Sequence, residues 1–108
     1  MLRVRQENHR LYVIGHAGWG PPGEDLVCAA ASILTAALGE NVKLLAQKGI
    51  VTRPVADLSP GLAEIGCIPV PGRENRVKAL YDSFLVGFRL LEESWPDYVK
   101  VEAERSAQ

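Results

Sequence analysis

The stretch GHAGWGPPGEDLVCAAAS, residues 15–32, joins an expected strand to an expected helix and sets the order of the elements around it. Three glycines and two prolines occupy residues 18–23, which is incompatible with a helix or a strand there. His16 precedes this loop and Cys28 follows it. The stretch therefore brings two reactive side chains to one junction, and no other part of the sequence does so.

The helix after the loop is predicted from apolar residues at steps of three and four. The repeat is Val27, Ala31, Leu34, Leu38, Val42 and Leu45, and we expect Leu26, Ala30, Ile33 and Ala37 to widen the buried stripe. Asp25 suits an N-cap and Gly49 suits a stop. We therefore expect one continuous helix to about Gln47, in spite of Gly39.

Alternation of apolar and polar residues predicts strands on both sides of this helix. The expected strands are residues 2–7, 10–15, 50–58, 62–68 and about 97–102, and the expected second helix is about 73–94. The order ββαββαβ indicates an α+β fold, a two-layer sandwich. Its two long helices would pack on one face of a largely antiparallel five-stranded sheet, in a single domain over residues 1–108.

The composition limits the classes of function. Hydrophobic residues make up 47% and charged residues 23%, as in ordinary globular proteins. A formal net charge of −1 argues against binding to nucleic acid. No apolar run reaches the roughly 18 residues of a membrane span, and the N-terminus lacks the apolar core of a signal peptide. We therefore expect a cytoplasmic protein with reduced thiols.

Cys28 and His16 have the residue types of a nucleophile and its base. The thiolate is the reactive form of cysteine, and a helix N-terminus or a protonated histidine stabilises it. With Asp25 as N-cap, Cys28 is the third helical residue, where first-turn N–H groups can also stabilise an oxyanion. Ser32 lies one turn later on the same side of the helix. Asp25 can either cap the helix or orient His16, and the residues alone leave both roles open.

Other interpretations of the same residues remain open. A cysteine in an alanine-rich helix is often a small core residue, and Cys67 in its strand is read that way. His9, in a turn, is read as a solvated residue. Trp19 can clamp a peptide or cover the core. A redox-sensing thiol at Cys28 would need a resolving cysteine, for which Cys67 is the only candidate. Two cysteines and two dispersed histidines lack metal-ligand spacing, so we expect no metal and no other cofactor.

The fixed positions of the stretch resemble the signature of the ribosomal-processing cysteine protease family, Prp. They are Gly15-His16-Ala17, Gly20, Gly23, Asp25, Val27-Cys28-Ala29 and Ser32. The resemblance implies a homodimeric cysteine endopeptidase with Cys28 as nucleophile and His16 as general base, supported by Asp25 and Ser32. It also implies a substrate loop that orders over the bound peptide, made here of Gly18, Trp19, Gly20, Pro21, Pro22 and Gly23.

The family's known substrate is the N-terminal extension of bacterial large-subunit ribosomal protein twenty-seven, which is removed during ribosome maturation. Phage relatives process capsid or scaffold proteins, so a phage-type role is one alternative. A non-catalytic ribosome-assembly or scaffold-binding module that keeps the motif for its shape is another. The resemblance thus implies a protein partner, with no direct role for nucleic acid or a membrane. Pro21 and Pro22 depart from the family pattern, and we expect them to stiffen the loop and alter the substrate fit.

Overall fold

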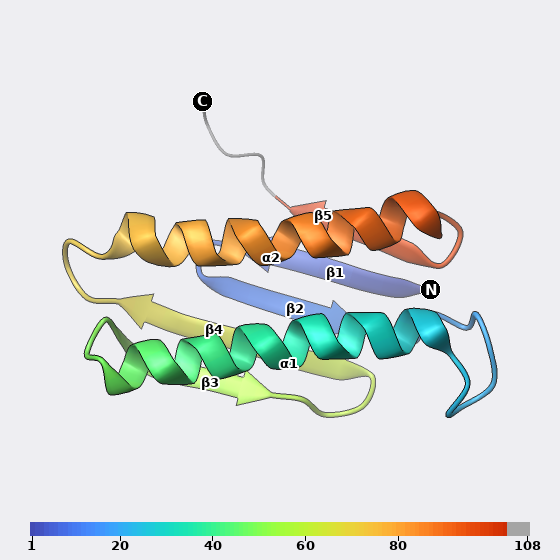
Figure 1. Ribbon diagram of the computed structural model, residues 1–108, viewed down its shortest axis with the longest axis horizontal. Helices are drawn as coiled ribbons and strands as arrows, with labels where there is room; N and C mark the ends of the chain where they lie inside the picture. Colours follow the sequence, from blue (N-terminus) through green and yellow to red (C-terminus); the bar gives the residue numbers. More distant parts are fainter. Residues whose placement is uncertain (104–108) are drawn as a thin grey trace.

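The computed structural model describes residues 1–103 as two helices side by side on one face of a five-stranded sheet (Figure 1). The elements are β1 (Leu2–Glu7), β2 (Arg10–Ile14), α1 (Leu26–Gln47), β3 (Val51–Asp57), β4 (Leu62–Pro69), α2 (Glu74–Ser94) and β5 (Val99–Ala103). The predicted ββαββαβ order and two-layer α+β fold are confirmed. The prediction of one domain over residues 1–108 includes residues 104–108, which lie outside the described part of the chain.

The strands lie in the order β3-β4-β2-β1-β5, an order that the sequence pattern did not provide. All neighbours are antiparallel except β1 and β5, which run parallel. Val4 of β1 lies opposite Val13 of β2 on one side and opposite Val101 of β5 on the other. The first strand is therefore an interior strand, held on both sides by segments distant from each other in sequence.

The core lies between the sheet and the two helices. In β1, Leu2 and Val4 are buried while Arg3 and Arg5 are exposed, as expected of a strand with one covered face. From α2, the large side chains of Tyr81 and Phe88 are completely buried. In β1, the alternation that predicted the strand thus also identifies the face that the helices cover.

Two glycines allow the helices to lie close to their neighbours. Helix α1 continues through Gly39 as predicted, and a methyl group added there would lie 3.1 Å from Ile65 Cδ1 in β4. A methyl group at Gly87 of α2 would lie 2.9 Å from Leu34 Cδ2 of α1. These positions lack a side chain because a neighbouring side chain fills the space.

The buried stripe of α1 is narrower than predicted. Leu26 is 62% exposed and Ile33 67% exposed, so the expectation that they widen the stripe is wrong. By length and composition alone α1 could cross a membrane. However, its Val27, Leu38 and Val42 are completely buried in the protein core. One side of this helix therefore packs in the core, and its other side carries apolar residues that are exposed.

Candidate active site

Asp25 joins the glycine-rich loop to the start of α1. Its Oδ1 accepts the backbone N–H of Cys28 at 2.9 Å, and its Oδ2 accepts the backbone N–H of Trp19 at 3.0 Å. Burial opposes ionisation of Asp25, but its backbone N–H donors, that of Cys28 first, outweigh burial and lower its pKa. Of the two roles left open, the structure shows the cap. No hydrogen bond joins Asp25 to His16 within residues 1–103.

The cap places Cys28 third in the helix, with its thiol facing the end of β2. Its Sγ accepts a hydrogen bond from the backbone N–H of Ala17 at 3.3 Å, and the side chain is half-buried. Ala17 itself is only 3% exposed. Two residues earlier, Gly15 N–H donates to Gly61 O at 2.8 Å and has a φ of 87°. The backbone of residues 15–17 is thus fixed both to the β3–β4 turn and to Cys28.

His16 is exposed and lies against the β3–β4 turn. A methyl group added at Gly61 would lie 3.4 Å from His16 Nε2, which shows how closely the ring approaches that turn. In the part of the chain that the structure describes, no hydrogen bond joins His16 and Cys28. Both side chains nevertheless border the same two hollows. Hydrogen bonds of catalytic groups are often looser without substrate than in the working complex.

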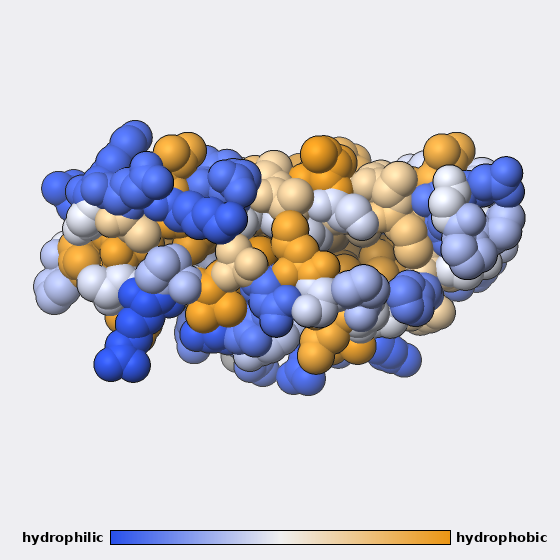
Figure 2. Space-filling view, turned by 90° about the horizontal axis from the view of Figure 1, so that it is seen from below, coloured by the Kyte–Doolittle hydropathy of each residue, from blue (hydrophilic) through white to orange (hydrophobic). Residues whose placement is uncertain are grey.

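The two hollows share His16, Cys28 and Ser32. The first, of about 410 Å³, extends between α1 and the β3–β4 turn, and its lining includes Ala31, Thr35, Ala36, Leu58, Pro60 and Ala63. Figure 2, seen from the α1 and β3 edge, shows hydrophobic residues gathered along the middle of this edge between hydrophilic ends. The first hollow is therefore mainly apolar.

The second hollow, of about 480 Å³, lies against the glycine-rich loop. Of the six predicted loop residues, Gly18, Gly20, Pro22 and Gly23 line it. Trp19 and Pro21 do not, and Trp19 is 40% exposed. The loop thus borders the site with backbone and small side chains, because its largest side chain is directed elsewhere.

Sequence reasoning missed the β3–β4 turn as part of the site. Leu58, Ser59, Pro60 and Gly61 all line the first hollow. The turn itself was recognisable from Ser59, Pro60 and Gly61, but no local signal shows that it contacts His16. That contact depends on β4 pairing with β2, where Leu62 lies opposite Ile14.

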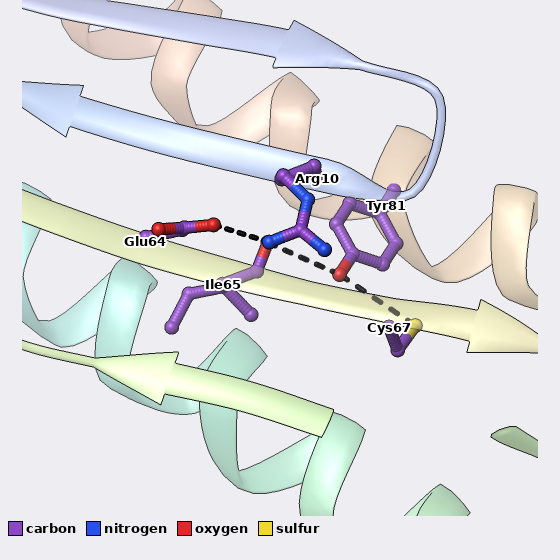
Figure 3. A network of polar contacts seen from close by, with 5 residues as sticks. All are labelled: Arg10, Glu64, Ile65, Cys67 and Tyr81. Carbon is purple, nitrogen blue, oxygen red and sulfur yellow. Dashed lines mark hydrogen bonds and ion pairs between the residues drawn. The ribbon is translucent and has the colours of Figure 1, made fainter. Parts of the chain in front are cut away.

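The second cysteine lies elsewhere, in a buried polar network (Figure 3). Cys67 is 5% exposed, and its Sγ lies 3.8 Å from the Tyr81 hydroxyl, which donates to Ile65 O at 3.3 Å. Nearby, Arg10 forms an ion pair with Glu64. The interpretation of Cys67 as a core residue is confirmed.

The same region contradicts two interpretations made from the sequence, that of His9 as a solvated residue and that of Cys28 as a redox sensor resolved by Cys67. The ring of His9 is half-buried and packs edge-on against Tyr81 with ring centroids 6.3 Å apart, so its interpretation as a solvated residue is wrong. Cys67 lies five residues along β4 from Leu62, or roughly 16 Å from the active-site end of the strand. Among residues 1–103, Cys28 therefore has no resolving cysteine beside it.

The Cys28 thiol lies at a capped helix start and borders the same hollows as the His16 imidazole. This arrangement is typical of the active site of a thiol hydrolase. The model of the family described as cysteine protease Prp matches residues 1–100. The chain therefore belongs to the Prp family and is a cysteine protease.

Solved structures share this fold. One is an essential ribosomal processing protease Prp from S. aureus with a covalently linked product peptide, at 20% identity and a TM-score of 0.69, covering 95% of this chain and 97% of that one. The same protease with a substrate peptide matches at 18% identity and a TM-score of 0.65, with coverage of 95% and 97%. SMU.848 from Streptococcus mutans matches at 28% identity and a TM-score of 0.64, with coverage of 94% and 89%. A comparison with curated proteins gives no match.

Proposed function

We propose that Cys28 is the nucleophile and His16 the general base of an endopeptidase. In this proposal the chain removes the N-terminal extension of large-subunit ribosomal protein twenty-seven during ribosome maturation. One observation carries the proposal: a capped helix start directs the Cys28 thiol into hollows that His16 also borders. Membership of the Prp family, and the ribosomal processing named for the S. aureus protease, support the choice of substrate.

In the reaction His16 transfers two protons in turn, first that of the Cys28 thiol and then one from the attacking water. His16 takes the proton of the Cys28 thiol, and the thiolate attacks the carbonyl carbon of the scissile bond. The tetrahedral intermediate collapses to a thioester when the C–N bond breaks, and the imidazolium gives its proton to the leaving amine. Water, deprotonated by His16, then attacks the thioester and releases the carboxylic acid, with the sulfur again protonated.

The two hollows offer room for a peptide on both sides of Cys28. The first accepts an apolar side chain, because alanines, Leu58 and Pro60 form much of its lining. The second faces loop backbone at Gly18, Gly20 and Gly23, which suits contacts to a peptide main chain. Ser32 borders both hollows, where its hydroxyl can hydrogen-bond the substrate beside the scissile bond. Asp25, which also borders the second hollow, acts through the cap.

We further propose a homodimer that works in the cytoplasm, as the family resemblance implies. Apolar side chains on the outer side of the helix pair support the dimer, since Ile33 is 67% and Val86 59% exposed. These residues are the sequence neighbours of Leu34 and Gly87, where the two helices touch. Sedimentation velocity should give a dimer mass for the native protein and a monomer mass for Ile33→Glu. A monomeric native protein would contradict the dimer.

The substrate is tested with synthetic peptides that span the ribosomal-protein extension and its junction with the mature sequence. The native protein should cut at one bond, identified by mass spectrometry, and Cys28→Ala should not cut. Peptides from phage capsid or scaffold junctions form the second arm, and preferential cutting there selects the phage-type role. Tight binding without any cutting by the native protein selects the non-catalytic module.

A further inference from the structure

Two backbone N–H groups at Cys28 have different hydrogen-bond partners. The N–H of Cys28 itself donates to Asp25 Oδ1 at 2.9 Å. The N–H of Ala17 donates to Cys28 Sγ at 3.3 Å. Acyl-transfer sites commonly use the nucleophile's own N–H to bind the oxyanion. Here that group already satisfies the helix cap, so the oxyanion needs another donor.

Ala17 has the fixed position that an oxyanion donor requires. Its side chain is 3% exposed and belongs to the core, so its backbone cannot move with the exposed loop. On one side, Gly15 is held to Gly61 O at 2.8 Å. On the other side, Gly18 adopts a φ of 73°, and the glycine-rich segment begins there. A donor held before the reaction costs no reorganisation when charge develops.

We propose that the backbone N–H of Ala17 donates the hydrogen bond that stabilises the oxyanion at this site. Where the reaction is cleavage of a peptide bond, this inference rests on the proposed function. As the Cys28 Sγ–C bond forms, the π electrons of the carbonyl move to its oxygen. That oxygen is bonded to the carbon under attack, so it comes close to the group that now contacts Sγ. The Ala17 N–H shifts its hydrogen bond from sulfur to the oxyanion. When the C=O bond re-forms, the amine leaves with the proton from His16, and the N–H returns to sulfur.

This assignment places the base and the donor in one dipeptide. His16 and Ala17 are consecutive, with one side chain exposed at the hollow and the other buried. Because the peptide between them is planar, the donor has a fixed position relative to the Cα of His16, and only the side-chain torsions of His16 change the distance from base to donor. The hydrogen bond to sulfur in the resting protein then marks the donor's position before substrate arrives.

The experiment removes the Ala17 N–H without changing its side chain. A synthetic segment of residues 1–27 is ligated to residues 28–108 at the native cysteine, with lactic acid in place of Ala17 so that an ester replaces the amide. The all-amide protein made in the same way is the reference. An ester at Asn8, an exposed turn residue outside the site, is the matched control. Circular dichroism and thermal unfolding confirm that each protein is folded.

Two reagents distinguish whether the Ala17 N–H stabilises the oxyanion or only the thiolate of Cys28. Acetylation by p-nitrophenyl acetate passes through an oxyanion, whereas alkylation by iodoacetamide does not. Mass mapping locates both labels on Cys28. We expect the Ala17 ester to slow acetylation by about 10²–10³-fold, the usual effect of losing one oxyanion donor, and to slow alkylation by no more than a tenth of that factor.

Equal losses in the two reactions would overturn the proposal, because the N–H would then act only on the thiolate. Unchanged acetylation would overturn it as well. Peptide cleavage is followed in parallel. If the all-amide protein cuts no peptide but the Ala17 ester still slows acetylation far more than alkylation, the proposed substrate fails and the oxyanion donor stands.

Discussion

The chain carries two cysteines in opposite surroundings. Cys28 is half-buried at a helix start, borders two hollows and accepts a backbone N–H. Cys67 is 5% exposed in β4 and lies beside a tyrosine hydroxyl. Burial raises the pKa of Cys67, and contacts with Tyr81 and Arg10 only partly offset it. The same thiol is thus placed for reaction in one region and kept as a neutral packing group in the other.

Each cysteine also has a histidine nearby, and the two pairs differ in the same way. His16 is exposed beside the hollows at Cys28. His9 packs edge-on against Tyr81, whose hydroxyl contacts Cys67. A cysteine and a histidine close together therefore do not define a catalytic pair. Solvent access and a backbone donor at the sulfur distinguish the reactive region from the buried one.

The largest expected effect separates the two cysteines by activity. Cys28→Ala should lower kcat/KM for the target peptide by more than about 10⁴-fold, since it removes the nucleophile. Cys67→Ala should keep kcat/KM within a few fold of the native value, measured below its unfolding temperature. Normal turnover by Cys28→Ala would contradict the difference between the two cysteines and the role of Cys28 as nucleophile.

The second prediction separates the two histidines. His16→Ala should lower kcat by about 10²–10⁴-fold, the usual contribution of a general base, and slow alkylation of Cys28 by iodoacetamide at pH 6. His9→Ala is the matched control and should change neither rate. An alkylation rate unaffected by His16→Ala would show that the imidazole does not help to form the thiolate.

The third prediction concerns the stability of the buried region. Tyr81→Phe removes a hydroxyl that donates to Ile65 O at 3.3 Å and contacts Cys67. We expect a loss of about 1 kcal/mol in the free energy of unfolding, with peptide cleavage unchanged. Urea unfolding with the native protein as reference measures it. Reduced cleavage by folded Tyr81→Phe would show that the two regions are coupled.

The fourth prediction divides the two contacts of Asp25. Asp25→Ala removes both acceptors and should cost about 1 kcal/mol of unfolding free energy through the lost cap. Asp25→Asn retains Oδ1 for Cys28 N–H but offers no second oxygen to Trp19 N–H. It should therefore keep most of the stability while the loop is released, which faster hydrogen exchange at Trp19 would reveal. Equal stability of the Ala and Asn variants would show that the cap contributes little.

The smallest effect is the acid dependence of that cap. The pKa of Asp25 is lower in the folded protein than the value of about 3.9 for an unfolded chain. Its contribution is therefore fully present above that unfolded value and is lost as the pH falls through the folded pKa. The stability gap between the native protein and Asp25→Ala should thus narrow below about pH 4. A gap that stays constant down to pH 2 would exclude ionised Asp25 as the cap.

Local signals predicted most of the fold, and distant contacts account for what they missed. Alternation predicted β1 and β5, and the repeat from Val27 to Leu45 predicted α1, because burial on one face repeats along these elements. Leu26 and Ile33 follow the same spacing but lie on the outer side. Apolar spacing alone cannot show where the covered face ends, because that depends on the position of α2.

In the site, too, local contacts were predictable from the sequence and distant contacts were not. Asp25 and Cys28 are three residues apart, so the cap was predictable from the sequence. The contact between Ala17 and Cys28 joins the two ends of the loop, and that between His16 and Gly61 joins the ends of the neighbouring strands β2 and β4, so neither has a local signature. The missing information was the strand order, which brings the β3–β4 turn to the end of β2.

The parallel pairing of β1 with β5 has a consequence for synthesis of the protein on the ribosome. Leu2, in the first strand, lines the hollow beside Cys28 and donates its N–H to Tyr98 O at 2.9 Å. A growing chain that has reached only α2 leaves β1 with an open edge and Leu2 without this support. Leu2 gains this support only when the segment from Tyr98 onward has been made and β5 pairs with β1. We therefore expect this lining of the hollow to form late in synthesis, after Cys28 and His16 have emerged.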